Sequence, residues 1–409
     1  MKNSGVEWIG EIPDDWESIR LKYIYSTTKA KLPKQFYDDK NLTPYLSMDF
    51  IRDSINTEPV YAKDGDYCSE EDILILWDGS NAGEIVFNHP AGYAPSTTAI
   101  LKKLSTQSLP VYDKFYLKAL EDDLRRNTNG MGIPHVNGSY LNNSLFLLPP
   151  KSTQQHIASY LDKKCSKIEE TIQNQQQVIE KLKAYKQSLI TEAVTGKIKI
   201  QNGIPDFKYC NLGFIAEFKN GLNYNASDFG TEVKFLGVGD FQNYLVLNDE
   251  SMFSNIITDT EIEDDYYLKN GDIIFVRSNG SKELVGRAIM VDNIDFKVTY
   301  SGFCIRLRNK EPKKINSKFL LYFFRSDYFR NELQRLSQGS NIANINQDLL
   351  SHIKIPLVDI RFQESVVDFL NKKCTAIDTI IKQKQNLIEK LTEYKKSLIY
   401  ECVTGKKEI

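Results

Sequence analysis

VIEKLKAYKQSLITEAVTGKIKI (residues 178–200) and LIEKLTEYKKSLIYECVTGKKEI (residues 387–409) are two copies of one stretch of sequence. The copies are 209 positions apart, and about half of the positions from 155 to 200 match their counterparts at this spacing. The match extends upstream, where Gly130 corresponds to Gly339. Self-similarity over so long a period indicates a tandem duplication of the whole chain. A protein made of two like halves suits a target that also has two halves.

Length and composition predict a soluble protein of the cytoplasm. At about 150 residues per domain, 409 residues correspond to two or three domains, each large enough for its own core. No apolar run is long enough to span a bilayer and the first residues lack the apolar stretch of a signal peptide, so we expect no membrane association. The six cysteines include no C-x-x-C pair and the four histidines have no ligand spacing, which predicts buried thiols and no metal site.

The formal net charge of −2 counts against a free-standing nucleic-acid binder, because such domains are usually clearly basic. It does not exclude DNA as a target, since local basic clusters can contact phosphates while the rest of the surface is acidic. A more basic partner can also help such a chain to close around DNA.

Two segments, 1–150 and 201–355, share one order of elements and are each predicted to be an α+β globule. In the first copy, β-rich runs bounded by turn residues and one helical run lie at 72–77, 84–87, 97–101 and 112–127. The second copy repeats this order with strands at 272–276 and 302–307 and a helix at 317–336. The spacing between the copies grows from 191 to 200 to 209, which predicts two insertions of roughly nine residues in the second copy, one of them in the acidic stretch 249–267.

The segments 151–200 and 356–409 each predict a long amphipathic helix, because apolar residues recur at steps of three and four. Ser152 with Gln155 resembles a capping box at the start of the first helix, and Gly196 suits a left-handed cap at its end. Roughly forty residues at about 1.5 Å per residue give a rod near 60 Å. The predicted core positions are Leu161, Ile168, Ile172, Gln175, Ile179, Leu182 and Leu189 in the first helix, and Leu370, Ile377, Ile381, Lys384, Ile388, Leu391 and Leu398 in the second.

A single apolar stripe needs a partner, and the other helix of the same chain is the nearest one. The globule between the two helices lets the chain return, which predicts an antiparallel coiled coil with a globule at each end. Gln175 and Lys384 interrupt the two stripes, and we expect them to meet near the pseudo-two-fold axis. Polar residues inside such a seam weaken it but fix register and orientation.

The sequence contains no catalytic motif, so we predict that the chain is not an enzyme. The N/D-P-P-Y/F motif of DNA amino-methyltransferases is missing, and the G-x-G in FLGVGDF (235–241) lacks the third glycine and following helix of a nucleotide site. The T-G-K at 195–197 is the tail of a helix and not part of a phosphate-binding loop.

Each copy carries two polar loops that contain glycine. WDGSNAG (77–83) corresponds to RSNGSKELVG (277–286), and TNGMGIPHVN (128–137) corresponds to SQGSNIANIN (337–346). Either loop alone reads as an ordinary turn, but its recurrence in both copies favours contact with DNA, where Arg, Lys, Ser and Asn reach base edges. When Trp77-Asp78 is matched with Val276-Arg277, Asp78 stands where the second copy has Arg277. Asp78 either accepts a hydrogen bond from a cytosine amino group or caps the turn, and we favour the cap. The candidate DNA-binding residues are Trp77, Asp78, Ser80, Asn81, Thr128, Asn129, His135, Asn137, Arg277, Ser278, Asn279, Ser281, Lys282, Ser340, Asn341, Asn344 and Asn346, with Lys29, Lys31, Arg125 and Arg126 as phosphate contacts.

Over its full length the chain resembles the specificity subunits of type I restriction-modification systems. The likeness rests on SGVEWIGEIPDDW (4–16), GSNIANINQDLLSHIKIPL (339–357) and the helix ends SLITEAVTGKI and SLIYECVTGKK. It implies two target-recognition domains, each reading one half of a split DNA site, with the coiled coil setting the unread spacing. The second domain departs from the pattern, since it begins QNGIPDFKYCN (201–211) without an SGVEWIGEIP-like lead-in.

The resemblance also implies partners and cofactors. Double-stranded DNA, two methyltransferase subunits docked on the helices and motor-nuclease subunits are the expected partners. S-adenosylmethionine, ATP and Mg²⁺ are expected in those subunits, with no cofactor or catalytic residue in this chain. Two alternatives stay open: a non-enzymatic protein scaffold with the coil as a spacer, and a bivalent DNA-binding regulator that acts without a methyltransferase.

Overall fold

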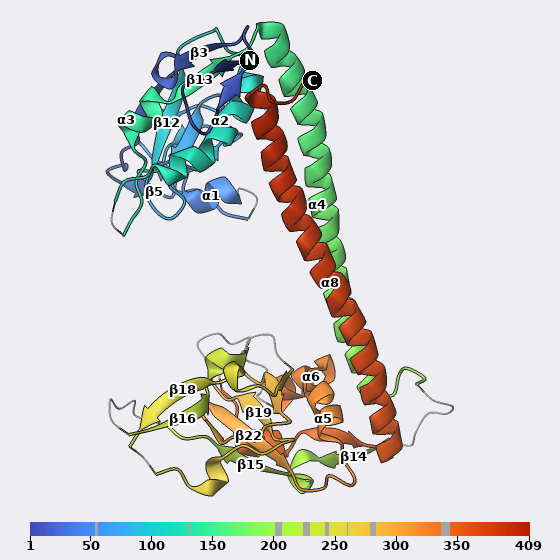
Figure 1. Ribbon diagram of the computed structural model, residues 1–409. Coiled ribbons are helices and arrows are strands. Elements are labelled where there is room, and N and C mark those ends of the chain that lie inside the picture. Colours follow the sequence, from blue (N-terminus) through green and yellow to red (C-terminus); the bar gives the residue numbers. More distant parts are fainter. Residues whose placement is uncertain are drawn as a thin grey trace. The chain divides into compact units, whose positions relative to one another are not determined.

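The computed structural model of the 409-residue chain describes residues 1–53, 56–130, 132–200, 207–223, 230–241, 245–259, 261–278, 284–336 and 344–409. These residues form two compact units: unit 1 comprises Met1–Gln175 and Asn386–Ile409, and unit 2 comprises Gln176–Gln385. Two helices of 44 residues each, α4 (Lys151–Val194) and α8 (Ile360–Val403), contribute one part to each unit (Figure 1). No helix within the described ranges is long and apolar enough to cross a membrane.

A four-stranded antiparallel sheet lies at the centre of unit 1. Its strands, in spatial order, are β10 (Ile85–Val86), β9 (Ile73–Leu76), β12 (Thr98–Lys103) and β4 (Tyr25–Lys29). Because side chains alternate along a strand, Ile73 and Ile75 share a core with α2 (Pro110–Arg126), whereas Leu74 packs on the opposite face with Phe50 of α1 (Met48–Arg52). Both faces are covered, which explains why β9 is an unbroken apolar run.

Shorter elements complete unit 1. The paired strands are β1 (Lys2–Asn3) with β2 (Glu11–Ile12), β3 (Glu17–Arg20) with β13 (Leu145–Leu148), β8 (Tyr67–Cys68) with β11 (Gly92–Tyr93), and β5 (Phe36–Tyr37), β7 (Tyr61–Ala62) and β6 (Thr43–Pro44) as a small sheet; the remaining short helices are η1 (Leu21–Tyr23) and α3 (Gly138–Asn143). The β1–β2 hairpin and its flanks bring Ile9, Ile12 and Trp16 into the core. The motif SGVEWIGEIPDDW (4–16) therefore contributes to the core of unit 1.

Unit 2 is built on a five-stranded mixed sheet, in which β17 pairs parallel with β20 and the other neighbouring strands pair antiparallel. Its strands, in spatial order, are β15 (Ala216–Asn220), β22 (Cys304–Asn309), β19 (Ile273–Val276), β20 (Ala288–Val291) and β17 (Val246–Leu247). The other elements are the sheet β18 (Ser254–Thr258), β16 (Thr231–Leu236) and β21 (Val298–Tyr300), the pair β14 (Lys208–Asn211) and β23 (Lys354–Leu357), and the helices η2 (Leu212–Phe214), η3 (Val238–Phe241), η4 (Glu250–Met252), η5 (Asp264–Tyr266), α5 (Ser317–Phe324), α6 (Asp327–Leu336) and α7 (Gln347–Ser351). Phe275 of β19 packs on Phe324 and Phe329 of α5 and α6, as β9 packs on α2 in unit 1. The α+β prediction is confirmed for both units.

Two local predictions are wrong. The segment 317–336 is not one helix, because the hydroxyl of Ser326 accepts a hydrogen bond from the Phe329 N–H (3.3 Å) and caps a new helix, α6. The capping box of Ser152 and Gln155 does not form, since α4 already includes Lys151 and the Gln155 amide donates to Ser159 further along the helix (3.3 Å).

The predicted insertions are also distributed differently. Thr98 pairs with Leu76 in unit 1, and Cys304 pairs with Val276 in unit 2, so positions 98 and 304 are equivalent at a spacing of 206. The spacing between equivalent positions therefore rises from 200 to 206 before position 98 and from 206 to 209 after it. The second predicted insertion is divided between at least two places. The acidic stretch 249–267 holds η4, β18 and η5.

The helices α4 and α8 run in opposite directions, and the same kind of ion pair joins them in each unit. In unit 1, Lys395 of α8 pairs with Glu169 of α4. In unit 2, the Nζ of Lys186 on α4 lies 2.6 Å from Oδ2 of Asp378 on α8. Lys186 and Lys395 are 209 positions apart, as are Glu169 and Asp378, so the two pairs are copies of one contact with the helices exchanged.

None of the predicted core positions of the two helices is exposed. Leu161, Ile168, Ile179, Leu189, Leu370, Ile377 and Leu398 are buried, and Ile172, Gln175, Leu182, Ile381, Lys384, Ile388 and Leu391 are half-buried. Gln175 and Lys384 belong to different units, so their meeting stays a prediction.

A glycine lies two residues beyond the end of each long helix, and Gly196 after α4 is the one predicted. Gly196 and Gly405 each have a φ of +72°, and the residue after each donates its N–H to a carbonyl five residues back, at 2.8 and 2.9 Å. A Cβ at Gly196 would collide with the ring of Phe207, and one at Gly405 with Pro13. The glycines are therefore required by backbone conformation and by packing.

A buried glutamine joins the globular part of each unit to its long helix. In unit 1 the Oε1 of Gln154 accepts from the Leu109 N–H (2.8 Å), and in unit 2 the Oε1 of Gln363, 209 positions later, accepts from the Asn316 N–H (2.9 Å). The Nε2 of each glutamine also donates to a backbone carbonyl just ahead of the long helix, at 2.8 and 2.9 Å. Leu109 and Asn316 are the N-cap residues of α2 and α5, so each glutamine fixes the start of that helix against the long helix.

Replacing Gln154 by Ala is expected to destabilise unit 1 by about 1–3 kcal/mol, because a buried N–H and a buried carbonyl lose their partner. Urea unfolding followed by circular dichroism measures the loss. Gln155→Ala is the matched control on the exposed side of the same helix and is expected to change stability by less than about 0.5 kcal/mol. Equal effects of the two substitutions would contradict the role of the buried amide.

Candidate nucleic-acid interface

The first loop (77–83) and the second loop (128–137) of unit 1 lie side by side. The Val136 N–H donates to the Trp77 carbonyl (2.9 Å), and positions 78 and 135 form an isolated antiparallel bridge. The sequence predicts two separate polar loops in each copy, and in unit 1 the fold brings the two loops together.

The same backbone frame holds the described ends of the corresponding loops in unit 2. The Ile345 N–H donates to the Arg277 carbonyl (2.9 Å), as Val136 does to Trp77. The Arg277 N–H donates to the Phe303 carbonyl (2.8 Å), as the Trp77 N–H does to the Thr97 carbonyl (2.7 Å). The two units therefore present different side chains on one copied frame.

A charged cluster lies where the two loops of unit 1 meet. Asp78 is bonded on both oxygens: Nζ of Lys29 lies 2.9 Å from Oδ2, and Nδ1 of His135 lies 2.6 Å from Oδ1. Burial raises the pKa of the Asp78 carboxyl, but the hydrogen bond from His135 and the charge of Lys29 outweigh it and hold that pKa below its ordinary value. An ionised carboxylate only accepts, so Nδ1 of His135 carries the proton of this hydrogen bond.

Two expectations for Asp78 are corrected by this geometry. Its carboxylate does not cap the turn, because both oxygens are held by Lys29 and His135. Its counterpart in unit 2 is Ser278 and not Arg277, because Arg277 makes the backbone bonds that Trp77 makes.

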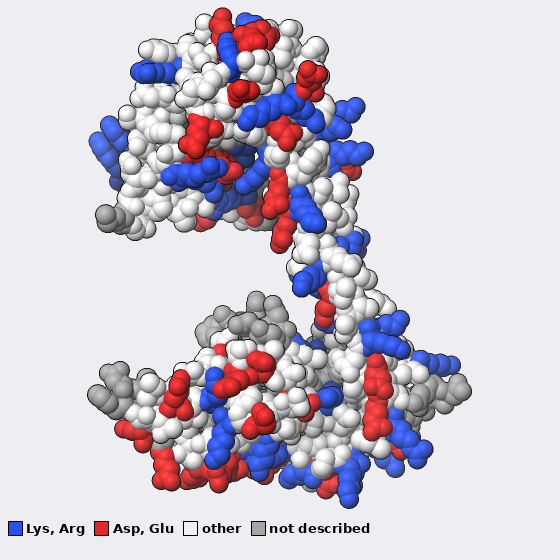
Figure 2. Space-filling view, in the orientation of Figure 1, with Lys and Arg blue, Asp and Glu red and all other residues white. Residues whose placement is uncertain are grey.

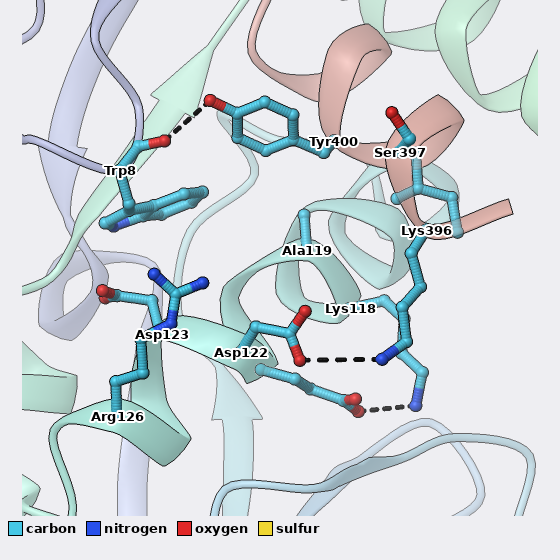
Figure 3. Close-up of a pocket in the computed structure, with 11 residues that line it drawn as sticks. Trp8, Lys118, Ala119, Asp122, Asp123, Arg126, Lys396, Ser397 and Tyr400 are labelled. Atoms are coloured by element: carbon cyan, nitrogen blue, oxygen red, sulfur yellow. Dashed lines mark hydrogen bonds and ion pairs between the residues drawn. The ribbon is translucent and has the colours of Figure 1, made fainter. Parts of the chain in front are cut away.

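A pocket of about 380 Å³ lies between α2 and the C-terminal part of α8 in unit 1 (Figure 3). Trp8 borders it, and the Trp8 carbonyl accepts a hydrogen bond from the Tyr400 hydroxyl (2.8 Å). Opposite charges pair along its wall: Lys118 with Glu121 (2.5 Å) and Lys396 with Asp122 (3.8 Å). Figure 3 shows Arg126, a predicted phosphate contact, beside Asp123 in this pocket.

Lys and Arg side chains are interspersed with Asp and Glu over the visible face of each unit (Figure 2). This mixture agrees with the small net charge of the chain.

The described residues include no group of three or more His, Cys, Asp or Glu side chains placed to hold a metal ion. The six cysteines are free thiols, five of them buried and Cys210 half-buried, and burial raises the pKa of Cys68, Cys304 and Cys402 to about 12.

Comparison with known proteins matches both halves of the chain to one family. A family model described as the type I restriction modification DNA specificity domain matches residues 13–182 and 205–390. The chain belongs to this family of specificity subunits. The MjaVIII specificity subunit of Methanocaldococcus jannaschii is 30% identical over 97% of this chain and 93% of the relative. The EcoDI specificity subunit of Escherichia coli is 21% identical over 97% of this chain and 89% of the relative.

Solved structures agree with the fold of a specificity subunit. A chain from the structural work on complex assembly and conformational transition of the type I restriction-modification system has a TM-score of 0.72 at 14% identity, covering 97% of this chain and 100% of its own. The crystal structure of the HsdS subunit from Thermoanaerobacter tengcongensis has a TM-score of 0.50 at 14% identity, covering 97% and 98%. At such low identity the likeness shows the fold alone.

All described candidate DNA-binding residues of this specificity subunit are at least partly exposed. Lys29, Lys31, Ser80, Arg125, Arg126, Asn129, His135, Asn344 and Asn346 are exposed, and Trp77, Asp78, Asn81, Thr128, Asn137, Arg277 and Ser278 are half-buried. The candidates Asn279, Ser281, Lys282, Ser340 and Asn341 lie outside the described residues.

Some candidates have structural contacts within their own unit. Asn137 and Asn346 are the N-caps of α3 and α7, where their side chains accept from Tyr140 N–H (3.0 Å) and Leu349 N–H (2.7 Å). The Trp77 ring lies against Gly138, where an added Cβ would be 3.0 Å from it. These contacts fix the loops in place.

The sequence did not predict two features: the convergence of three candidate residues beside the loops, and the glutamine contacts that join the globular parts to the long helices. The convergence of Lys29, Asp78 and His135 carries no sequence signal, because the three positions are far apart in the chain. The Gln154 and Gln363 contacts had a signal, since both residues recur at the spacing of 209. The spacing shows that these residues repeat, but it does not show which polar repeats are buried.

Lys29→Met is expected to raise the pKa of Asp78, because burial of the carboxylate remains while the cation is lost. A carbon-detected NMR titration of the Asp78 carboxyl measures this shift. Since the folded-state pKa lies below the ordinary 3.8, the cluster's stabilisation is complete above that pH and is lost as the pH falls through the folded value. Lys31→Met is the control, because the exposed Lys31 contacts Asp66 through its backbone N–H; a shift of Asp78 in this variant alone would refute the assignment.

Proposed function

We propose that this specificity subunit reads a bipartite site in double-stranded DNA, one half with the loops of each unit. The observation that carries the proposal is the copied backbone frame with different side chains in the two units. A frame held by backbone bonds places side chains at fixed positions, and the side chains select the bases. Two such readers in one chain fit a site with two unlike halves.

The two long helices set the unread spacing between the half-sites in this proposal. Each has 44 residues, which corresponds to roughly 66 Å at 1.5 Å per residue. The buried glutamines support a spacer role, because they fix the start of α2 and α5 against the long helix of the same unit. A reader that could swing on its helix would lose the spacing.

In this proposal the chain has no catalytic residues of its own, and partner subunits supply the catalytic activity. Two methyltransferase subunits dock on the long helices and bring S-adenosylmethionine, and motor-nuclease subunits with ATP and Mg²⁺ join them. Tyr185 and Tyr394 support two docking sites for copies of one partner. They are 209 positions apart, and both are exposed on a long helix, at 56% and 54%. Exposed tyrosines are frequent anchors of protein interfaces.

The two tyrosines provide a test of docking. Tyr185→Ala or Tyr394→Ala alone is expected to weaken one of the two sites by about 2 kcal/mol, so that the complex retains one tightly bound methyltransferase subunit. The double substitution is expected to weaken both. Native mass spectrometry of the purified complex counts the subunits, and Tyr23→Ala, at a tyrosine 57% exposed outside the long helices, is the matched control. Full occupancy in the double variant would rule out these positions as anchors.

The reading function is tested by expressing the chain with its methyltransferase in a host without DNA methylation. Long-read sequencing then maps modified bases. A split motif with methylated adenines in both halves and a constant spacer is the expected result. A soluble complex that leaves the genome unmodified and binds DNA without sequence preference would instead favour a scaffold.

A further inference from the structure

We infer that three equivalent positions determine what each unit reads: Lys29, Asp78 and His135 in unit 1, and Asn220, Ser278 and Asn344 in unit 2. The inference rests on the proposed reading function and names the side chains that carry it.

The equivalence of the first position follows from strand register. Lys29 ends β4 and is opposite Ala99 of β12, which is opposite Ile75 of β9. Asn220 ends β15 and is opposite Ile305 of β22, which is opposite Phe275 of β19. The two residues therefore end the same row of the two sheets.

The equivalence of the other two positions follows from the loop frame. Asp78 follows Trp77 and forms a bridge with His135 in unit 1, and Ser278 follows Arg277 and forms a bridge with Asn344 in unit 2. His135 and Asn344 are 209 positions apart. One strand end and two loops thus bring three distant positions of the chain to one place in unit 1, as the contacts of Asp78 with Lys29 and His135 show.

The chemistry at these three positions differs completely between the units. Unit 1 has an ammonium, a carboxylate and an imidazole, and unit 2 has two amides and a hydroxyl. The side chains of Lys29 and His135 are 49% and 48% exposed, so both reach solvent, whereas Asp78 is 22% exposed and orients them. Lysine donors suit guanine O6 and N7, whereas asparagine pairs with adenine N6 and N7.

Six neighbouring described positions are less suited to discriminate between bases. Asn137 and Asn346 are the same residue in both units and cap a helix in each. Val136 and Ile345 are buried. Trp77 lies against Gly138, and the Arg277 guanidinium donates to its own unit at the Gly302 carbonyl (3.5 Å).

The test exchanges the three side chains between the units. One variant carries K29N, D78S and H135N, and the reciprocal variant carries N220K, S278D and N344H. Each is purified in complex with the methyltransferase, and bound DNA is selected from pools in which one half-site of the wild-type motif is randomised. The first variant is expected to change base preference by roughly ten- to a hundred-fold at one or more positions of the unit 1 half-site, and the reciprocal variant at the unit 2 half-site. The other half-site keeps its preference in each case.

The control K114N with D162S removes another Lys–Asp pair of unit 1 (2.7 Å), which involves the first turns of α2, at the far end of that helix from the loops. It is expected to leave both half-sites unchanged. Unchanged preferences in both exchange variants, or equal changes in both half-sites, would overturn the inference while leaving the proposed function intact. A wild-type complex that selects no split motif would overturn the proposed function, and the inference with it.

Discussion

The burial of one apolar stripe on each long helix is the constraint on which the rest of the structure depends. A fully buried Leu or Ile side chain contributes about 1.5–3 kcal/mol, and both helices carry several such residues in the cores of their units. The ion pairs of Lys186 with Asp378 and of Lys395 with Glu169 are partly exposed, so each is worth about 1 kcal/mol or less. Apolar burial therefore supplies the stability of the helix pair. The ion pairs select one register of the two helices, because both pairs join equivalent residues. Lys186 and Lys395 are duplicates of each other, and so are their partners Asp378 and Glu169.

The attachment of the globular parts uses a different physical means. A buried amide bonded on both its oxygen and its nitrogen has one acceptable position, because any displacement leaves a buried polar group without a partner. Gln154 and Gln363 make such contacts at the start of the two long helices. At the other end of each helix, Gly196 and Gly405 allow the chain to turn tightly against an aromatic or proline ring. Both ends are therefore fixed by residues that the duplication has kept.

Much of the fold could be predicted from periodicity and duplication, because both are properties of the sequence itself. The apolar steps of three and four located both helices, and the β-rich runs located the central strands. The errors came from single side chains. Ser326 breaks a helix that propensity alone would continue, and at the start of α4 the buried contacts are made by Gln154 with Leu109 and Pro149, not by a capping box of Ser152 and Gln155. A one-residue error in matching Asp78 to Arg277 arose because the loops differ in sequence, and only backbone bonds could correct it.

The candidate site was predictable in its location but not in its composition. The two polar loops of each unit were identified by their glycines and their recurrence, yet their adjacency depends on bonds such as that between Val136 and Trp77. Lys29 was placed among the phosphate contacts, whereas the fold pairs it with Asp78 beside the second loop. The duplication gives two units with one backbone frame, and the exposed side chains of one unit can differ from those of the other without disturbing the buried bonds of either. The fold tolerates a change of side chain best where backbone bonds hold the frame, as at positions 78 and 135 of unit 1 and positions 278 and 344 of unit 2.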